Sequence, residues 1–235
     1  MLPLLLLLSL QPVPPPDFEP LYRQALAERE RKLGPTASLT LQSKRDLALY
    51  LAARGQYSAA APFVEPALAT AATPEAATVL HNWAVALEES DSALAERLYR
   101  QALLLRAKAL PALDVELATT RLNLAGLLLA KANPAATPLA RLALAAFEKQ
   151  LGPNDTRTGA ACGILGALRA IQGDVPGAEQ FFRRALAIAE HAHGPQAPET
   201  ASALENLADL LAQTGRELAA RPLLQRAQQI RSRPR

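Results

Sequence analysis

The chain has 235 residues, of which 50% are hydrophobic, 4% aromatic and 20% charged. Its single cysteine, Cys162, excludes a disulfide framework within the chain, and its many hydrophobic residues exclude wholesale disorder. The formal net charge of +3 is too small to indicate nucleic-acid binding. Abundant Ala, Leu, Arg and Glu with few aromatic residues predict helices, and 19 prolines require those helices to be short.

The first ten residues, MLPLLLLLSL, form an apolar run, and the proline-rich segment QPVPPP follows it. The run is shorter than the roughly 20 residues that a membrane-spanning helix needs. It resembles the apolar core of a secretory signal, although no basic residue precedes it and no small-x-small cleavage site follows. We therefore expect residues 1–16 to be either a signal peptide or a disordered leader. The first alternative predicts a periplasmic or secreted protein, and the second a cytoplasmic one.

From residue 17 onward the sequence contains an internal repeat. A small residue follows a leucine or tryptophan at steps of 36, 41, 41 and 42 residues, at Ala48, Ala84, Ala125, Gly166 and Ala208. A turn position comes seven residues after each, at Gly55, Asp91, Ala132, Gly173 and Gly215. A second small residue stands eleven or twelve residues further on, and a proline-led breaker separates the copies. This fixed phase indicates a structural repeat.

Each copy predicts two helices joined by a tight turn, here named helix A and helix B. In the last copy we expect helix A at about 199–213 and helix B at about 216–230. Residues 17–35 carry only the helix-B pattern and predict an unpaired leading helix. The complete copies are expected at 36–73, 74–110, 111–152, 153–194 and 195–231, before a basic tail at 232–235. Since one pair cannot bury its apolar face, the pairs should stack.

The repeated pattern resembles the tetratricopeptide repeat, in the longer form of about 42 residues that occurs in kinesin light chains and many bacterial proteins. The string Asn206-Leu207-Ala208-Asp209-Leu210-Leu211, followed by Gly215, carries this resemblance, and its beginning recurs at Asn82 and Asn123. The resemblance implies an all-α, right-handed superhelical solenoid of antiparallel helix pairs, with about five repeats after the leading helix. It also implies a non-catalytic adaptor that binds a segment of a partner protein in its concave groove.

In this family helix A lines the concave groove, and the resemblance places the partner-binding residues there. Carried over by position, they are Arg45, Asp46, His81, Asn82, Asn123, Glu205, Asn206 and Asp209. An asparagine amide offers a donor and an acceptor, which suits the unpaired backbone of an extended peptide. The fourth copy departs from the pattern, with Gly163 and Ile164 at these positions. The alternative interpretation is that these side chains only stabilise neighbouring helices or are solvated.

The sequence contains no catalytic triad, metal-ligand cluster or cofactor motif, so we expect no enzyme activity, metal or cofactor. An enzyme whose active site carries no recognisable motif is an alternative interpretation. His191 and His193 are two residues apart and do not face each other on a helix. Cys162 is expected to be a small buried thiol. A competing function is binding of a membrane or nucleic acid through the arginine-rich end, at Arg216, Arg221, Arg226, Arg231, Arg233 and Arg235. We favour a protein partner, because the last helix of a stack needs a polar outer face.

Overall fold

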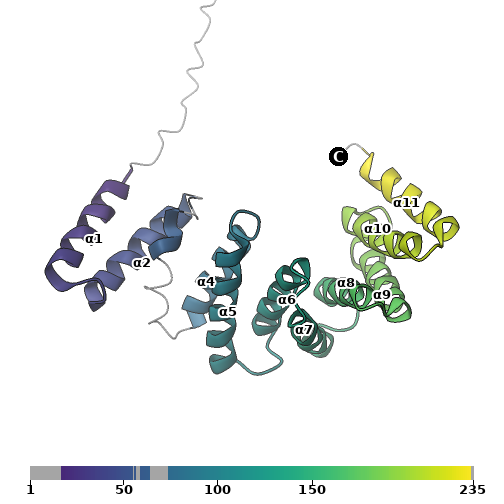
Figure 1. The fold of residues 1–235 in the computed structure, drawn as a ribbon, viewed down its shortest axis with the longest axis horizontal. Coiled ribbons are helices and arrows are strands. Elements are labelled where there is room, and N and C mark those ends of the chain that lie inside the picture. The colour runs from purple at the N-terminus through teal and green to yellow at the C-terminus, as the bar shows by residue number, and fades with distance from the viewer. Residues whose placement is uncertain (1–16, 55, 57–58, 64–73, 234–235) are drawn as a thin grey trace, which may run out of the picture. The chain divides into compact units, whose positions relative to one another are not determined.

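The structure, a computed structural model, describes residues 17–54, 56, 59–63 and 74–233. Every regular element in these residues is an α-helix (Figure 1), which confirms the predicted all-α fold. No helix in these ranges is long and apolar enough to cross a membrane. The chain divides into two compact units, residues 1–67 and 68–235, which we describe separately. The predicted leader, residues 1–16, and the last two residues of the basic tail lie outside the described residues.

The first unit contains α1 (Glu19–Leu33) packed against α2 (Ser38–Ala53). The hydroxyl of Tyr50 on α2 connects the two helices. It donates to the carboxylate of Asp17 over 2.9 Å and accepts the backbone N–H of Phe18 over 2.8 Å. These bonds hold the beginning of α1, the helix expected from an isolated helix-B pattern, against α2.

The second unit consists of helix pairs that follow one another along the chain (Figure 1). Its helices are α4 (Pro74–Leu87), α5 (Ser92–Ala109), α6 (Val115–Ala130), α7 (Ala136–Gln150), α8 (Thr156–Ile171), α9 (Val175–His193), α10 (Pro198–Gln213) and α11 (Glu217–Arg231). Each even-numbered helix is a helix A and packs against the helix B that follows it. In the last repeat both helices begin and end within one residue of the predicted limits.

Small residues on helix A let the two helices of a pair approach closely. Ala84, Ala125 and Ala208 have no exposed surface. In the fourth repeat Gly166 holds this position, and a Cβ atom added to it would lie 2.7 Å from the ring of Phe182. The close approach predicted at these positions is thus confirmed. Phe182 belongs to a buried cluster that includes Ala208, so the ring also joins the α8–α9 pair to the next repeat.

The turns that end α6, α8 and α10 share one hydrogen-bond pattern. After α10, the N–H of Arg216 donates to the carbonyl of Leu211 over 2.8 Å, and that of Gly215 to Ala212 over 3.0 Å. This Schellman ending needs a residue in the left-handed conformation, which Gly215 supplies with φ of +75°. Gly173, with φ of +77°, closes α8 in the same way.

The third repeat makes the same turn with an alanine. Ala132 has φ of +50°, and the N–H of Asn133 donates to the carbonyl of Leu128 over 2.9 Å. A residue other than glycine in this conformation carries roughly 1–2 kcal/mol of strain. Glycine removes the strain, but part of the gain is offset because glycine loses more conformational entropy on folding. We therefore expect Ala132→Gly to raise the free energy of unfolding by about 1 kcal/mol, measured from the urea midpoint.

The matched control for this substitution is Ala130→Gly, in the last turn of α6. Ala130 has ordinary helical geometry, so glycine there should lower the free energy of unfolding by roughly 0.5–1 kcal/mol. An unchanged or lowered midpoint in Ala132→Gly would contradict the strain assigned to this turn.

Ion pairs join the helix B of one repeat to the helix B of the next. Arg184 Nη1 on α9 lies 2.6 Å from Glu148 Oε1 on α7. Arg226 Nη1 on α11 lies 2.5 Å from Glu190 Oε1 on α9. The second pair stands 42 residues after the first, which is the length of one repeat. The same electrostatic contact is therefore used twice in the array.

Candidate binding groove

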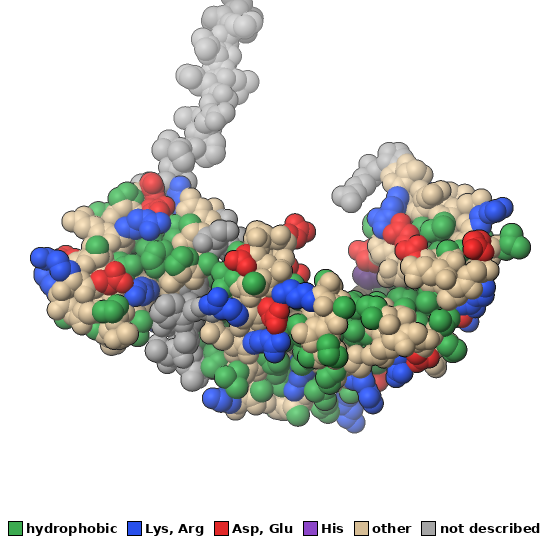
Figure 2. Space-filling model, viewed as in Figure 1, with side chains coloured by type: hydrophobic (Ala, Val, Ile, Leu, Met, Phe, Trp, Pro, Cys, Tyr) green, Lys and Arg blue, Asp and Glu red, His purple; other side chains and the backbone are tan. Residues whose placement is uncertain are grey.

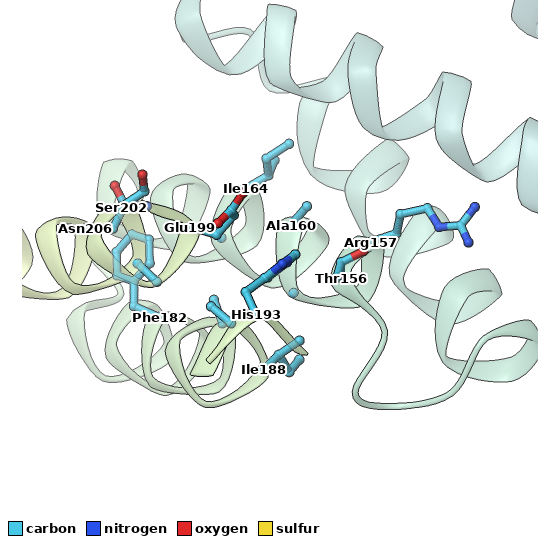
Figure 3. A pocket seen from close by; sticks show the side chains of 15 residues that line it. Thr156, Arg157, Ala160, Ile164, Phe182, Ile188, His193, Glu199, Ser202 and Asn206 are labelled. Carbon is cyan, nitrogen blue, oxygen red and sulfur yellow. The ribbon is translucent and has the colours of Figure 1, made fainter. Parts of the chain in front are cut away.

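A cavity of about 550 Å³ opens between α8, α9 and α10. Phe182 and Ile188 line it from α9, Ile164 from α8 and Ala203 from α10 (Figure 3). Hydrophobic side chains also gather over α8 on the face shown in Figure 2. The cavity therefore forms an apolar recess between two successive A helices, with the intervening helix B behind them.

The recess is open because Gly163 has no side chain. A Cβ atom added to Gly163 would meet no atom within 4 Å. Between α6 and α8, in contrast, the space is filled, and a Cβ atom on Gly126 would lie 3.5 Å from Cδ1 of Ile164. The two residues at which the fourth repeat departs from the expected pattern therefore shape the groove. Ile164 fills it beside α6, and Gly163 leaves it open beside α10.

One face of α10 supplies polar groups to the cavity. Glu199, Ser202 and Asn206 follow one another at helical spacing and all line the cavity. Figure 3 shows Ser202 and Asn206 beside Phe182, and Arg157 at the other end, pointing away from the remaining labelled side chains. An apolar recess bordered by hydrogen-bonding side chains is a common form of ligand site.

Three of the predicted groove residues lie on α10. Asn206 lines the cavity and is exposed, and Asp209 is exposed on the same face one turn later. Glu205 is instead engaged with α11, because its two carboxylate oxygens accept from Nε and Nη2 of Arg231, over 2.6 Å each. The bonds to Arg231 lower the pKa of Glu205. The partner-binding roles of these residues stay predictions.

The predicted residues of the second and third repeats lie on α4 and α6. Asn82 is exposed, whereas Asn123 is half-buried and its amide donates to the hydroxyl of Tyr99 over 3.4 Å. His81 is buried, with Nδ1 3.3 Å from Oγ1 of Thr120, and its ring centroid lies 5.4 Å from that of Tyr99. His81 and Asn123 thus make contacts within the packing of α4, α5 and α6. Partner binding by Asn82 and Asn123 stays a prediction.

Arg45 and Asp46 lie on α2, in the first unit. Nε of Arg45 is 3.7 Å from Oδ1 of Asp46, and each side chain is 42% exposed. The two charges compensate each other in part, which leaves a weak surface ion pair. The cavity belongs to the second unit, so it does not test these two residues, and their role in partner binding stays a prediction.

A buried arginine that the sequence analysis did not identify lies between α4, α5 and α6. Arg106 is 2% exposed. Its Nη1 donates to the carbonyl of Glu116 over 2.8 Å and to Oγ1 of Thr120 over 2.6 Å. Its Nη2 donates to Oγ1 of Thr78 over 3.2 Å and to Oε2 of Glu116 over 3.0 Å. Burial, with the charge of Arg106, lowers the pKa of His81 to about 4, so the imidazole beside this guanidinium is neutral.

The single cysteine lies in the interior of the second unit. Cys162 is buried, as predicted, and burial raises the pKa of its thiol to about 11. Across residues 17–54, 56, 59–63 and 74–233, no three His, Cys, Asp or Glu side chains are grouped to hold a metal ion.

The family model of the tetratricopeptide repeat matches residues 160–233, which include most of α8 and all of α9, α10 and α11. The crystal structure of BtubC (BKLC) from P. vanneervenii is similar over 91% of both chains, with a TM-score of 0.66 and 22% identity. The fold is that of the tetratricopeptide repeat. The resemblance predicted from the sequence is therefore confirmed.

Other solved structures are similar too. One is a putative kinesin light chain with nearly identical TPR-like repeats from Podosopora anserina, with 20% identity and a TM-score of 0.62 over 83% of this chain and 97% of that one. Another is MamA (41-end) from Desulfovibrio magneticus RS-1, with 15% identity and a TM-score of 0.59 over 81% and 94%. No curated protein sequence matches the chain.

Proposed function

We propose that the protein is a non-catalytic interaction scaffold that binds an extended segment of a partner protein in the groove between α8 and α10. The observation that carries this proposal is the apolar cavity of about 550 Å³ beside Gly163. An apolar side chain of the partner would fill it, and burial stabilises binding by about 25 cal/mol per Å² of apolar surface. The tetratricopeptide-repeat fold supports the proposal, since stacked repeats form extended binding surfaces.

The polar face of α10 suits the backbone of such a segment. The amide of Asn206 can donate and accept at once, and it forms no hydrogen bond within the described ranges. Ser202 lies one turn earlier, with its hydroxyl 3.2 Å from the carbonyl of Pro198. An extended peptide exposes one N–H and one C=O per residue, and the amide of Asn206 would pair with them.

Binding of an anionic surface through the C-terminal arginines has less support. Three of them form ion pairs within the fold: Arg216 with Glu179 at 2.9 Å, Arg226 with Glu190 at 2.5 Å and Arg231 with Glu205 at 2.6 Å. Their charge is largely compensated, which weakens the attraction to phosphate groups. Export and the cytoplasmic alternative stay predictions, because both depend on residues 1–16.

Gly163→Phe is expected to weaken partner binding strongly without unfolding the protein. The new side chain has open space at its Cβ and would occupy the cavity itself. Replacing glycine inside a helix also removes a penalty of roughly 0.5–1 kcal/mol, so stability should not fall. The probes are peptides selected from a random phage-displayed library on the wild-type protein, then titrated by fluorescence polarisation. We expect the variant to bind them at least about tenfold more weakly.

Gly163→Ala is the matched control, because a single methyl group leaves most of the cavity open. Circular dichroism should show equal helix content in all three proteins. The proposal fails if the library yields no peptide, or if the selected peptides bind the Gly163→Phe variant as tightly as the wild type.

A further inference from the structure

The charges around the cavity specify the partner further. We infer that the groove takes an extended segment in which an apolar anchor residue is flanked on both sides by Lys or Arg. This inference rests on the proposed function and adds the chemistry of the bound segment.

The groove side of α10 carries two uncompensated negative charges. Glu199 and Asp209 are both exposed, and neither carboxylate forms an ion pair or hydrogen bond with any residue in the described ranges. They share a face with Ser202 and Asn206, and α10 contains no Lys or Arg. This face therefore attracts cations and repels acidic segments.

The opposite wall does not cancel that charge. Arg157 of α8 lines one end of the cavity, but its Nε lies 3.3 Å from Oδ1 of Asp155, and Figure 3 shows it pointing away. Arg169, also on α8, pairs with Asp174 at 2.8 Å. Nη2 of Arg231 lies 3.2 Å from Oγ of Ser202 at the cavity, but it also pairs with Glu205 at 2.6 Å. His193 is a further basic side chain that lines the cavity, and one positive charge offsets only part of the charge of two carboxylates. The groove is thus acidic although the chain carries a net charge of +3.

The spacing of the two carboxylates fits an extended peptide with the cavity between them. Glu199 and Asp209 are ten residues apart, or about 15 Å along the helix axis at 1.5 Å per residue. An extended segment covers that distance in about four to five residues. The α10 side chains at the cavity are Glu199, Ser202, Ala203 and Asn206, so its centre lies between the two charges. Alternate residues of an extended chain face the same side, which gives the pattern basic-x-apolar-x-basic.

Three labelled peptides with identical flanks test this pattern. Their cores are Lys-Ala-Leu-Ala-Lys, Gln-Ala-Leu-Ala-Gln and Glu-Ala-Leu-Ala-Glu. For the wild-type protein at low salt we expect the Lys peptide to bind about three- to tenfold more tightly than the Gln peptide, from two exposed charge pairs, and the Glu peptide to bind most weakly. The difference should shrink at high salt.

Charge reversal supplies the complementary measurement. The double variant Glu199→Lys/Asp209→Lys should prefer the Glu peptide over the Lys peptide. Glu217→Gln is the matched control, because Glu217 is an exposed carboxylate in the first turn of α11 that does not line the cavity. This control should keep the wild-type order of affinities.

Each outcome separates the partner chemistry from the function of the groove. Equal affinities of the three peptides, all lost in Gly163→Phe, would overturn the inference and leave the proposed function standing. Tighter binding of the Glu peptide, or an unchanged order in the double variant, would also overturn the inference. If none of the peptides binds, the basic-apolar pattern is wrong, and the library selection on the wild type and Gly163→Phe decides the function separately.

Discussion

Arg106→Ala is expected to lower the free energy of unfolding by about 3 kcal/mol, because it creates a cavity and removes several buried hydrogen bonds at once. The guanidinium connects α5 to Thr78 on α4 and to Glu116 and Thr120 on α6. The loss should appear as a lower urea midpoint by circular dichroism. Faster amide exchange should be concentrated in α4, α5 and α6, since repeats respond locally.

Arg100→Ala is the control on the same helix. Arg100 is 52% exposed and pairs with Glu96 at 2.9 Å, so its removal should cost less than about 1 kcal/mol. Arg106→Met keeps most of the side-chain volume without the hydrogen bonds. If Arg106→Ala lowers the free energy of unfolding by less than about 1 kcal/mol, the structural role assigned to the buried arginine is contradicted.

The second large effect is a pH dependence of the free energy of unfolding, to which His81 contributes. Its pKa in the folded protein is lowered to about 4 from the ordinary 6.5, chiefly by burial and further by Arg106. Between these values the unfolded chain takes up a proton that the folded protein does not bind. The contribution to stability is therefore fully present above pH 6.5 and declines as the pH falls, until it is lost at about pH 4. The expected change is roughly 2–3 kcal/mol.

Urea unfolding of the wild type and of His81→Asn at several pH values within this window measures the effect. The acidic side chains contribute equally to both proteins, so the difference between the two profiles isolates His81. His191→Asn, at an exposed position, is the control and should follow the wild type. Parallel profiles for the wild type and His81→Asn would show that His81 is not held neutral in the folded state.

Most of the fold could be predicted because each repeated position has one physical cause. Ala125 and Ala208 mark the places where helices approach, and Gly215 marks a left-handed turn. Asp174 stands directly before α9, and its carboxylate accepts the N–H of Gly177 over 3.1 Å. These signals are local in sequence, so they placed α10 and α11 to within one residue.

Less of the site could be predicted, since it depends on distances between helices. Arginines are mostly surface residues, and nothing near Arg106 in the sequence indicates that its acceptors come from α4 and α6. The cavity likewise depends on the spacing of α8 and α10. Glu199 and Ser202 could have been found, however, because they precede the predicted Asn206 by seven and four residues and so share its helix face.

The two ion pairs that recur one repeat apart, Glu148–Arg184 and Glu190–Arg226, strengthen the contact between neighbouring repeats rather than any single repeat. In a linear array, the balance between the stability of each repeat and the energy of the interface between neighbours sets how cooperatively the repeats melt. Each of the four side chains is between 34% and 39% exposed, so dissolved salt screens both pairs. High ionic strength therefore weakens the contacts between these neighbouring repeats and favours stepwise over concerted melting. The α10 wall of the binding groove belongs to a repeat that one of these pairs, Glu190–Arg226, holds to its neighbour.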